Sequence, residues 1–127
     1  MLIKKNIADS KEFLANDNTL LKEVLHPTND TDAPIGYSLA FARLQPKTQS
    51  APHRLKSSET YIFIKGTGTM HTDKERCKVQ AGDVVLVPPS TIQYLINDSL
   101  CDDLCFYCIV EPFWKKEEDE LIPNFVY

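Results

Sequence analysis

The chain has 127 residues, of which 43% are hydrophobic and 25% are charged, and these values are typical of one globular domain. Fourteen Lys and Arg residues against 18 Asp and Glu residues give a formal net charge of −4, which argues against a nucleic-acid partner because such a partner requires a basic surface. The sequence has no apolar run of about 18 residues and no secretory signal, so we expect no membrane association and a cytoplasmic location.

The first 34 residues predict a short helix followed by a strand. Asp9 and Ser10 can cap a helix that begins in the sequence KEFLA. Residues 19–25 are compatible with a helix or a strand, and of the two we expect a strand. His26-Pro27 follows, and proline ends either type of element.

From residue 35 onward the sequence has the pattern of β-strands. Short, mostly apolar segments alternate with turns rich in Gly, Pro, Ser and Asp, and no helical periodicity lies between them. This pattern predicts a β-sandwich or barrel. Gly66 and Gly82 stand at turns, where glycine adopts a positive φ without steric cost. The expected strands span residues 37–44, 59–65, 68–72, 83–87, 92–97 and 104–110.

Two of the four cysteines have the CxxC spacing of zinc and redox motifs. Cys105 and Cys108 lie inside an expected strand, however, where a separation of three places the two thiols on opposite faces. We therefore interpret the cysteines as reduced thiols and not as a zinc knuckle or a redox turn.

The end of the chain predicts a short surface helix and an apolar tail. Residues 114–120 (WKKEEDE) form a charged run, and residues 121–127 are mostly apolar. An apolar end must pack on its own barrel or on a second copy. Because bare edge strands also favour association, we expect a homodimer.

Two segments carry motifs that together indicate a known family. The matching positions are His53, Glu59, Gly66, Gly82, Pro88 and Asn97, and the departing positions are Lys47, Leu55, Ser90 and Gln93. At this spacing the chain resembles the small single-domain cupins across residues 47–97. The resemblance implies an all-β fold, the double-stranded β-helix or cupin jelly-roll barrel, with short terminal helices. It also implies one domain over residues 1–127, with a core barrel of roughly 35–112 and terminal extensions at 1–34 and 113–127.

The resemblance places candidate site residues inside the barrel. In cupins, the positions of His53, Leu55, Glu59 and Gln93 hold a divalent metal. His53, Glu59 and Gln93 are therefore candidate ligands for Fe, Mn, Ni or Zn, whereas Leu55 offers no donor atom. Strand alternation adds further inward residues, so the expected pocket consists of Tyr61, Phe63, Leu55, Gln93 and Leu95.

Three functions for this pocket stay open from the sequence. The first is metal-assisted chemistry on a small polar or carbohydrate-like metabolite. The second is a metal-free isomerase or lyase in which His53 and Glu59 are the catalytic acid and base. The third is binding or sensing of a small molecule without a reaction. Leu55 favours the last two, and Arg43 or Arg54 at the pocket mouth could meet an anionic substrate.

Overall fold

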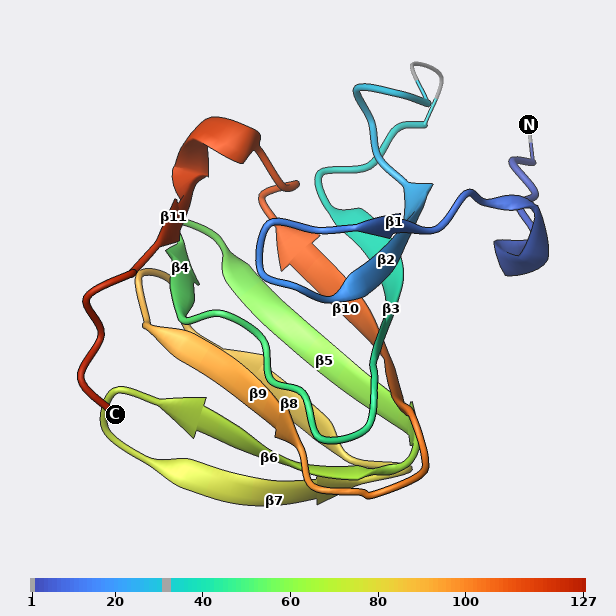
Figure 1. The fold of residues 1–127 in the computed structure, drawn as a ribbon. Helices are drawn as coiled ribbons and strands as arrows, with labels where there is room; N and C mark the ends of the chain where they lie inside the picture. Colours follow the sequence, from blue (N-terminus) through green and yellow to red (C-terminus); the bar gives the residue numbers. More distant parts are fainter. Residues whose placement is uncertain (1, 31–32) are drawn as a thin grey trace.

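The computed structural model describes residues 2–30 and 33–127, which form eleven strands in two antiparallel sheets (Figure 1). In spatial order, the six-stranded sheet contains β1 (Phe13–Leu14), β2 (Leu20–Leu25), β3 (Ser38–Leu44), β10 (Leu104–Glu111), β5 (Ser58–Lys65) and β8 (Val84–Val87). The five-stranded sheet contains β11 (Asp119–Leu121), β4 (His53–Leu55), β9 (Gln93–Asn97), β6 (Thr67–Thr72) and β7 (Arg76–Gln80). The all-β double-stranded β-helix predicted from the sequence is confirmed.

All six strands predicted after residue 35 are present, as is the strand predicted at residues 19–25. Four further strands, β1, β4, β7 and β11, were not predicted. They have two to five residues each, and β7 has the largely exposed sequence RCKVQ. Segments this short carry no clear alternation in the sequence. They become strands because they pair with neighbouring strands.

The helical segments of the described residues are two 3₁₀ turns, η1 (Ile7–Asp9) and η2 (Lys116–Glu118). The prediction of a helix in KEFLA is wrong. Phe13–Leu14 instead forms β1, which pairs with β2, and Arg43 binds the preceding residue, Glu12. The helix predicted at residues 114–120 shrinks to η2, after which the chain enters β11. Neither turn is long and apolar enough to cross a membrane.

The hydrophobic core fills one end of the space between the sheets. Phe63 packs between Tyr61 and Phe106, with ring centroids 5.9 Å and 5.5 Å away. Phe63, Phe106 and Leu95 are each 1% exposed, and full burial of such side chains contributes about 1.5–3 kcal/mol each. This packing fills that end of the barrel, and a cavity lies toward the end where β4 and the start of β5 are placed.

Glycine at two turns lets the strands connect. Gly66 and Gly82 have φ values of +91° and +96°, as expected from the sequence. At Gly66 a Cβ atom would also lie 2.5 Å from the carbonyl oxygen of Asp103, so the adjacent loop can approach only a glycine. The four cysteines are free thiols, which excludes a disulfide between Cys105 and Cys108 in this structure.

Both terminal extensions join the sheets. The N-terminal extension supplies β1 and β2 beside β3, and the C-terminal extension supplies β11 beside β4 (Figure 1). After β11 the chain packs Phe125 and Tyr127 against Tyr94, at centroid distances of 5.5 Å and 5.2 Å. The apolar end thus contacts its own barrel, and both extensions lie where they can contribute to a pocket.

Candidate functional site

A cavity of about 320 Å³ opens at the end of the barrel that the core leaves unfilled. Its walls come from the barrel and from both extensions, and its volume suits a small organic molecule. The residues that line it include Phe13, Asp17, His53, Glu59, Trp114 and Asp119.

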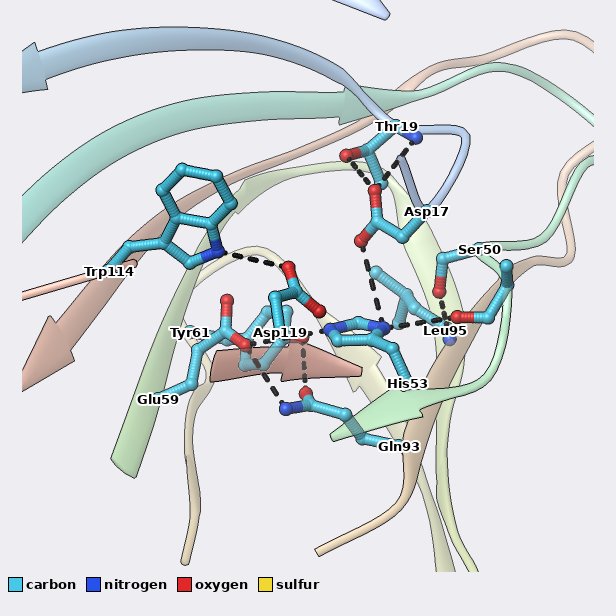
Figure 2. A network of polar contacts seen from close by, with 11 residues as sticks. Asp17, Thr19, Ser50, His53, Glu59, Tyr61, Gln93, Leu95, Trp114 and Asp119 are labelled. Atoms are coloured by element: carbon cyan, nitrogen blue, oxygen red, sulfur yellow. Dashed lines mark hydrogen bonds and ion pairs between the residues drawn. The ribbon is translucent and has the colours of Figure 1, made fainter. Parts of the chain in front are cut away.

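His53 lies at the centre of a polar network at the cavity wall (Figure 2). It begins β4, where it pairs with Gln93 of β9 on one side and with Leu121 of β11 on the other. Its Nδ1 atom donates a hydrogen bond of 3.0 Å to the carbonyl oxygen of Ala51, which fixes the ring. Its Nε2 atom lies 4.0 Å from Oε1 of Glu59, a charge contact too long for a direct hydrogen bond.

Two carboxylates control the protonation of His53. Burial is the largest single influence and disfavours the imidazolium, since the side chain is 4% exposed. Glu59 and Asp17 outweigh that cost, and together with the Ala51 carbonyl they raise the pKa of His53 to about 9. The imidazole is therefore positively charged at neutral pH, with a carboxylate near each of its nitrogens.

Glu59, Gln93 and Tyr61 form a buried chain of hydrogen bonds behind the cavity wall. The Gln93 amide nitrogen donates to Oε1 of Glu59 at 3.1 Å, and the Tyr61 hydroxyl donates to the Gln93 amide oxygen. Burial raises the pKa of Tyr61 well above its ordinary value, so its hydroxyl remains a donor. This chain holds Glu59 in position and occupies both ends of the Gln93 amide.

The N-terminal extension supplies Asp17, which sequence reasoning missed. Its Oδ1 atom accepts hydrogen bonds from the Thr19 backbone N–H at 3.2 Å and from the Thr19 hydroxyl at 2.7 Å. These bonds leave Oδ2 directed at His53, 3.9 Å from Nδ1. The Asp-x-Thr sequence signals a local turn, but nothing in it indicates contact with a histidine in a distant strand.

The C-terminal extension supplies Trp114 and also Asp119, which sequence reasoning missed. The Trp114 indole N–H donates to Oδ2 of Asp119 at 2.9 Å, while Oδ1 is buried without a hydrogen-bond partner in the described part of the chain. Burial raises the pKa of Asp119, and the indole N–H opposes that rise. Asp119 reaches the cavity because β11 pairs with β4 so that it lies opposite Leu55.

The two-sheet barrel agrees with a comparison against known families. Residues 40–110 match the family described as a cupin domain. The chain belongs to the cupin family. A relative from Methanocaldococcus jannaschii, the uncharacterised protein MJ1618, is 26% identical over 121 residues, which are 95% of each chain.

Solved cupin-like structures share the fold at low sequence identity. The plu4264 protein from Photorhabdus luminescens has a TM-score of 0.74 and 24% identity, over 93% of this chain and 92% of the other. The polyketide cyclase RemF from Streptomyces resistomycificus has a TM-score of 0.79 and 11% identity, over 100% of this chain and 88% of the other. The cupin-domain match excludes Asp17, Trp114 and Asp119, which lie in the two extensions.

The donor atoms at the four cupin metal positions do not fit a metal ion in this chain. Leu55 has no donor atom, and the Gln93 amide oxygen is shared with the Tyr61 hydroxyl, so the donors free of hydrogen bonds are one nitrogen of His53 and one oxygen of Glu59. Within residues 2–30 and 33–127, no group of three or more His, Cys, Asp or Glu side chains is arranged to hold a metal. Two free donors are fewer than transition metals take in protein sites.

The structure divides the expected pocket residues into three groups. His53, Leu55 and Glu59 line the cavity. Tyr61 and Gln93 lie one layer behind it, in the hydrogen-bond chain. Phe63 and Leu95 do not line this cavity, because they fill the closed end of the barrel as core residues.

Proposed function

We propose that this cupin is an acid–base enzyme, an isomerase or lyase, in which His53 and Glu59 move a proton of a small polar molecule. The observation that carries this proposal is the placement of the two groups at one cavity wall, with His53 Nε2 4.0 Å from Glu59 Oε1. A positively charged imidazole beside a carboxylate provides an acid and a base at one point of the cavity.

The two residues have separate roles. In Figure 2, the second carboxylate oxygen of Glu59 points away from Gln93, so it is available as the base. It would take a proton from a carbon next to a carbonyl group, while His53 donates its Nε2 proton to the carbonyl oxygen. In an isomerase Glu59 returns the proton to a different carbon of the enol, and in a lyase Glu59 gives it to a departing group on the next carbon. In both cases a hydroxyl proton of the enol returns to His53, which restores a carbonyl group and regenerates both residues. Each positioned acid or base typically contributes about 10²–10⁴-fold in rate.

Proton exchange in D₂O tests this proposal without knowledge of the substrate. We expect the protein to catalyse loss of α-proton NMR signals in at least one member of a panel of small carbonyl compounds. Glu59→Gln and His53→Gln should each reduce that exchange by about a hundredfold or more. Exchange that continues unchanged in both variants would show that other groups catalyse it, and the proposal would fail.

Binding without a reaction is the second candidate. The Tyr61–Gln93–Glu59 chain satisfies the buried amide and hydroxyl, as in a purely structural polar network. A protein that binds ligands in the cavity but exchanges no protons in any compound of the panel would support this function.

We also propose a homodimer that covers an apolar part of the six-stranded sheet. Ile64, Val84 and Leu86 are 44%, 64% and 62% exposed on neighbouring strands β5 and β8, and β8 is an edge strand. A second copy would bury this surface. Sedimentation equilibrium should give a dimer that Leu86→Lys disrupts and that Leu100→Lys, in an exposed loop, leaves intact. A wild-type protein that stays monomeric at all accessible concentrations contradicts the dimer.

A further inference from the structure

Carboxylates outnumber basic groups around the cavity. The acidic residues that line it are Asp17, Glu23, Glu59 and Asp119, and the basic residue types are His26, His53 and Lys116. Both ring nitrogens of His26 are engaged within the protein, since Nε2 lies 2.7 Å from the Trp114 carbonyl oxygen and Nδ1 accepts from the Thr28 N–H at 3.2 Å. Even with His53 and Lys116 counted as positive, the four carboxylates leave an excess of negative charge.

The two arginines that could have bound an anion are engaged elsewhere. Arg43 pairs with Glu12 at 2.7 Å and with Asp103 at 3.0 Å, and Arg54 pairs with Glu120 at 2.6 Å. Neither arginine lines the cavity. An anionic ligand would therefore face carboxylates with only the exposed Lys116 and an already paired His53 to oppose them.

Two carboxylate groups that line the cavity each have an oxygen that accepts no hydrogen bond from the described residues. Oδ1 of Asp119 is buried and has no hydrogen-bond partner within the described residues. The Glu59 side chain is 10% exposed, and its second oxygen points away from Gln93 (Figure 2). Leaving such a buried acceptor unpaired costs about 1–3 kcal/mol, and more when it is charged, so a ligand that donates to it gains that energy.

Apolar surface lies beside these acceptors. Trp114 holds Asp119 through its indole N–H, and Phe13, Leu14 and Leu55 add apolar surface to the cavity walls. An aromatic ring beside a carboxylate attracts an organic cation through both its charge and its apolar part.

We propose that the ligand of this cavity is a small organic amine that carries a positive charge, with its ammonium group on Asp119 and its apolar part against Trp114. This inference names the substrate class of the proposed acid–base site and rests on that function only for the choice of cavity. Anionic metabolites, such as phosphate esters and carboxylic acids, are excluded by the same charges.

Three probes of similar size and different charge test the inference on the wild-type protein. Benzylamine is positive at neutral pH, benzyl alcohol is uncharged and benzoate is negative. Trp114 is the single tryptophan of the chain, so its fluorescence reports binding directly. We expect saturable binding of benzylamine with a Kd about tenfold or more below that of benzyl alcohol, and no saturable binding of benzoate. Equal or tighter binding of the alcohol or of benzoate would overturn the inference.

A matched pair of variants assigns the effect to Asp119. Asp119→Asn and Glu117→Gln each remove one negative charge, but Glu117 lies in η2 and does not line the cavity. Asp119→Asn should weaken benzylamine binding about tenfold, and Glu117→Gln should leave it unchanged. If both substitutions weaken binding equally, the preference for benzylamine comes from the overall negative charge of the protein, and the assignment to Asp119 is overturned.

The outcomes separate this inference from the proposed function. If benzylamine binds preferentially but no carbonyl compound exchanges protons, the proposed amine ligand is supported and the proposed acid–base activity is refuted. If proton exchange occurs but benzylamine is not preferred, the acid–base activity is supported and the amine ligand is refuted.

Discussion

The carboxylate of Asp17 lies 3.9 Å from Nδ1 of His53, although Asp17 is outside the segment that matches the cupin domain. Thr19 holds that carboxylate through two hydrogen bonds, so its position does not depend on His53. The imidazole consequently has a negative group near each nitrogen, one from the barrel and one from the N-terminal extension. This arrangement makes the protonation of His53 sensitive to a residue outside the cupin-domain match.

Replacing Asp17 with Asn should lower the pKa of His53 from about 9 toward its ordinary value. The amide keeps the shape of the side chain but removes one of the two opposing charges, a change that typically shifts a neighbour by about one unit. NMR titration of the imidazole nitrogens measures the shift. Asp9→Asn, in the exposed turn η1, is the control, and an unchanged His53 pKa in Asp17→Asn would contradict the role assigned to Asp17.

The protonation of His53 should also make stability depend on pH. Because folding raises the pKa of His53 to about 9, the stabilisation is complete below about pH 6.5, the unfolded value, and is lost as the pH rises to about 9. The free energy of unfolding changes by at most about 3.4 kcal/mol over this range. Urea unfolding of wild type and His53→Gln between these pH values should show a steeper decline for the wild type. Parallel declines would mean that folding does not shift this pKa.

Restoring the two missing donors should create a metal site. Wild-type protein should retain little Fe, Mn, Ni or Zn after dialysis, because Leu55 has no donor and Tyr61 occupies the Gln93 oxygen. The double variant Leu55→His with Gln93→His should bind about one ion per chain by elemental analysis. If the untagged wild-type protein held close to one metal ion per chain and His53→Ala abolished this binding, the conclusion that these residues do not fit a metal ion would be wrong.

Removing the Tyr61 hydroxyl should destabilise the protein. Tyr61→Phe leaves the Gln93 amide oxygen buried without its donor, at a cost of about 1–3 kcal/mol in the free energy of unfolding. Tyr107→Phe is the matched control, since Tyr107 is half-buried on the same sheet and packs edge-on against Phe41. Urea denaturation compares the two, and equal stabilities would show that the hydroxyl is not needed.

Much of the barrel could be predicted because its sequence carries local signals. Turn residues separate the strands of residues 37–110, and Gly66 and Gly82 stand where positive φ values occur. Motif spacing identified His53, Glu59 and Gln93, and the structure brings these three together. Spacing is informative here because β4, β5 and β9 lie inside the segment shared with other cupins.

The remaining features depend on contacts between distant segments. Alternation predicts that Phe63 and Leu95 point inward, but not that side chains fill their end of the barrel. Asp17 and Asp119 reach the cavity through a local turn and the register of a three-residue strand. The charged run at residues 114–120 has the composition of a surface helix, and only pairing with β4 makes its last residues a strand.

The pairing of β11 with β4 places Asp119 opposite Leu55, so a cavity carboxylate is carried by a segment outside the cupin-domain match. Substitutions in such a segment can alter what the cavity accepts while the residues that fold the barrel stay the same. Proteins with identical cupin motifs can therefore have diverged in ligand preference through their ends alone. Relatives grouped by the residues aligned with 13–17 and 114–121, and not by those aligned with 40–110, should therefore share a ligand preference.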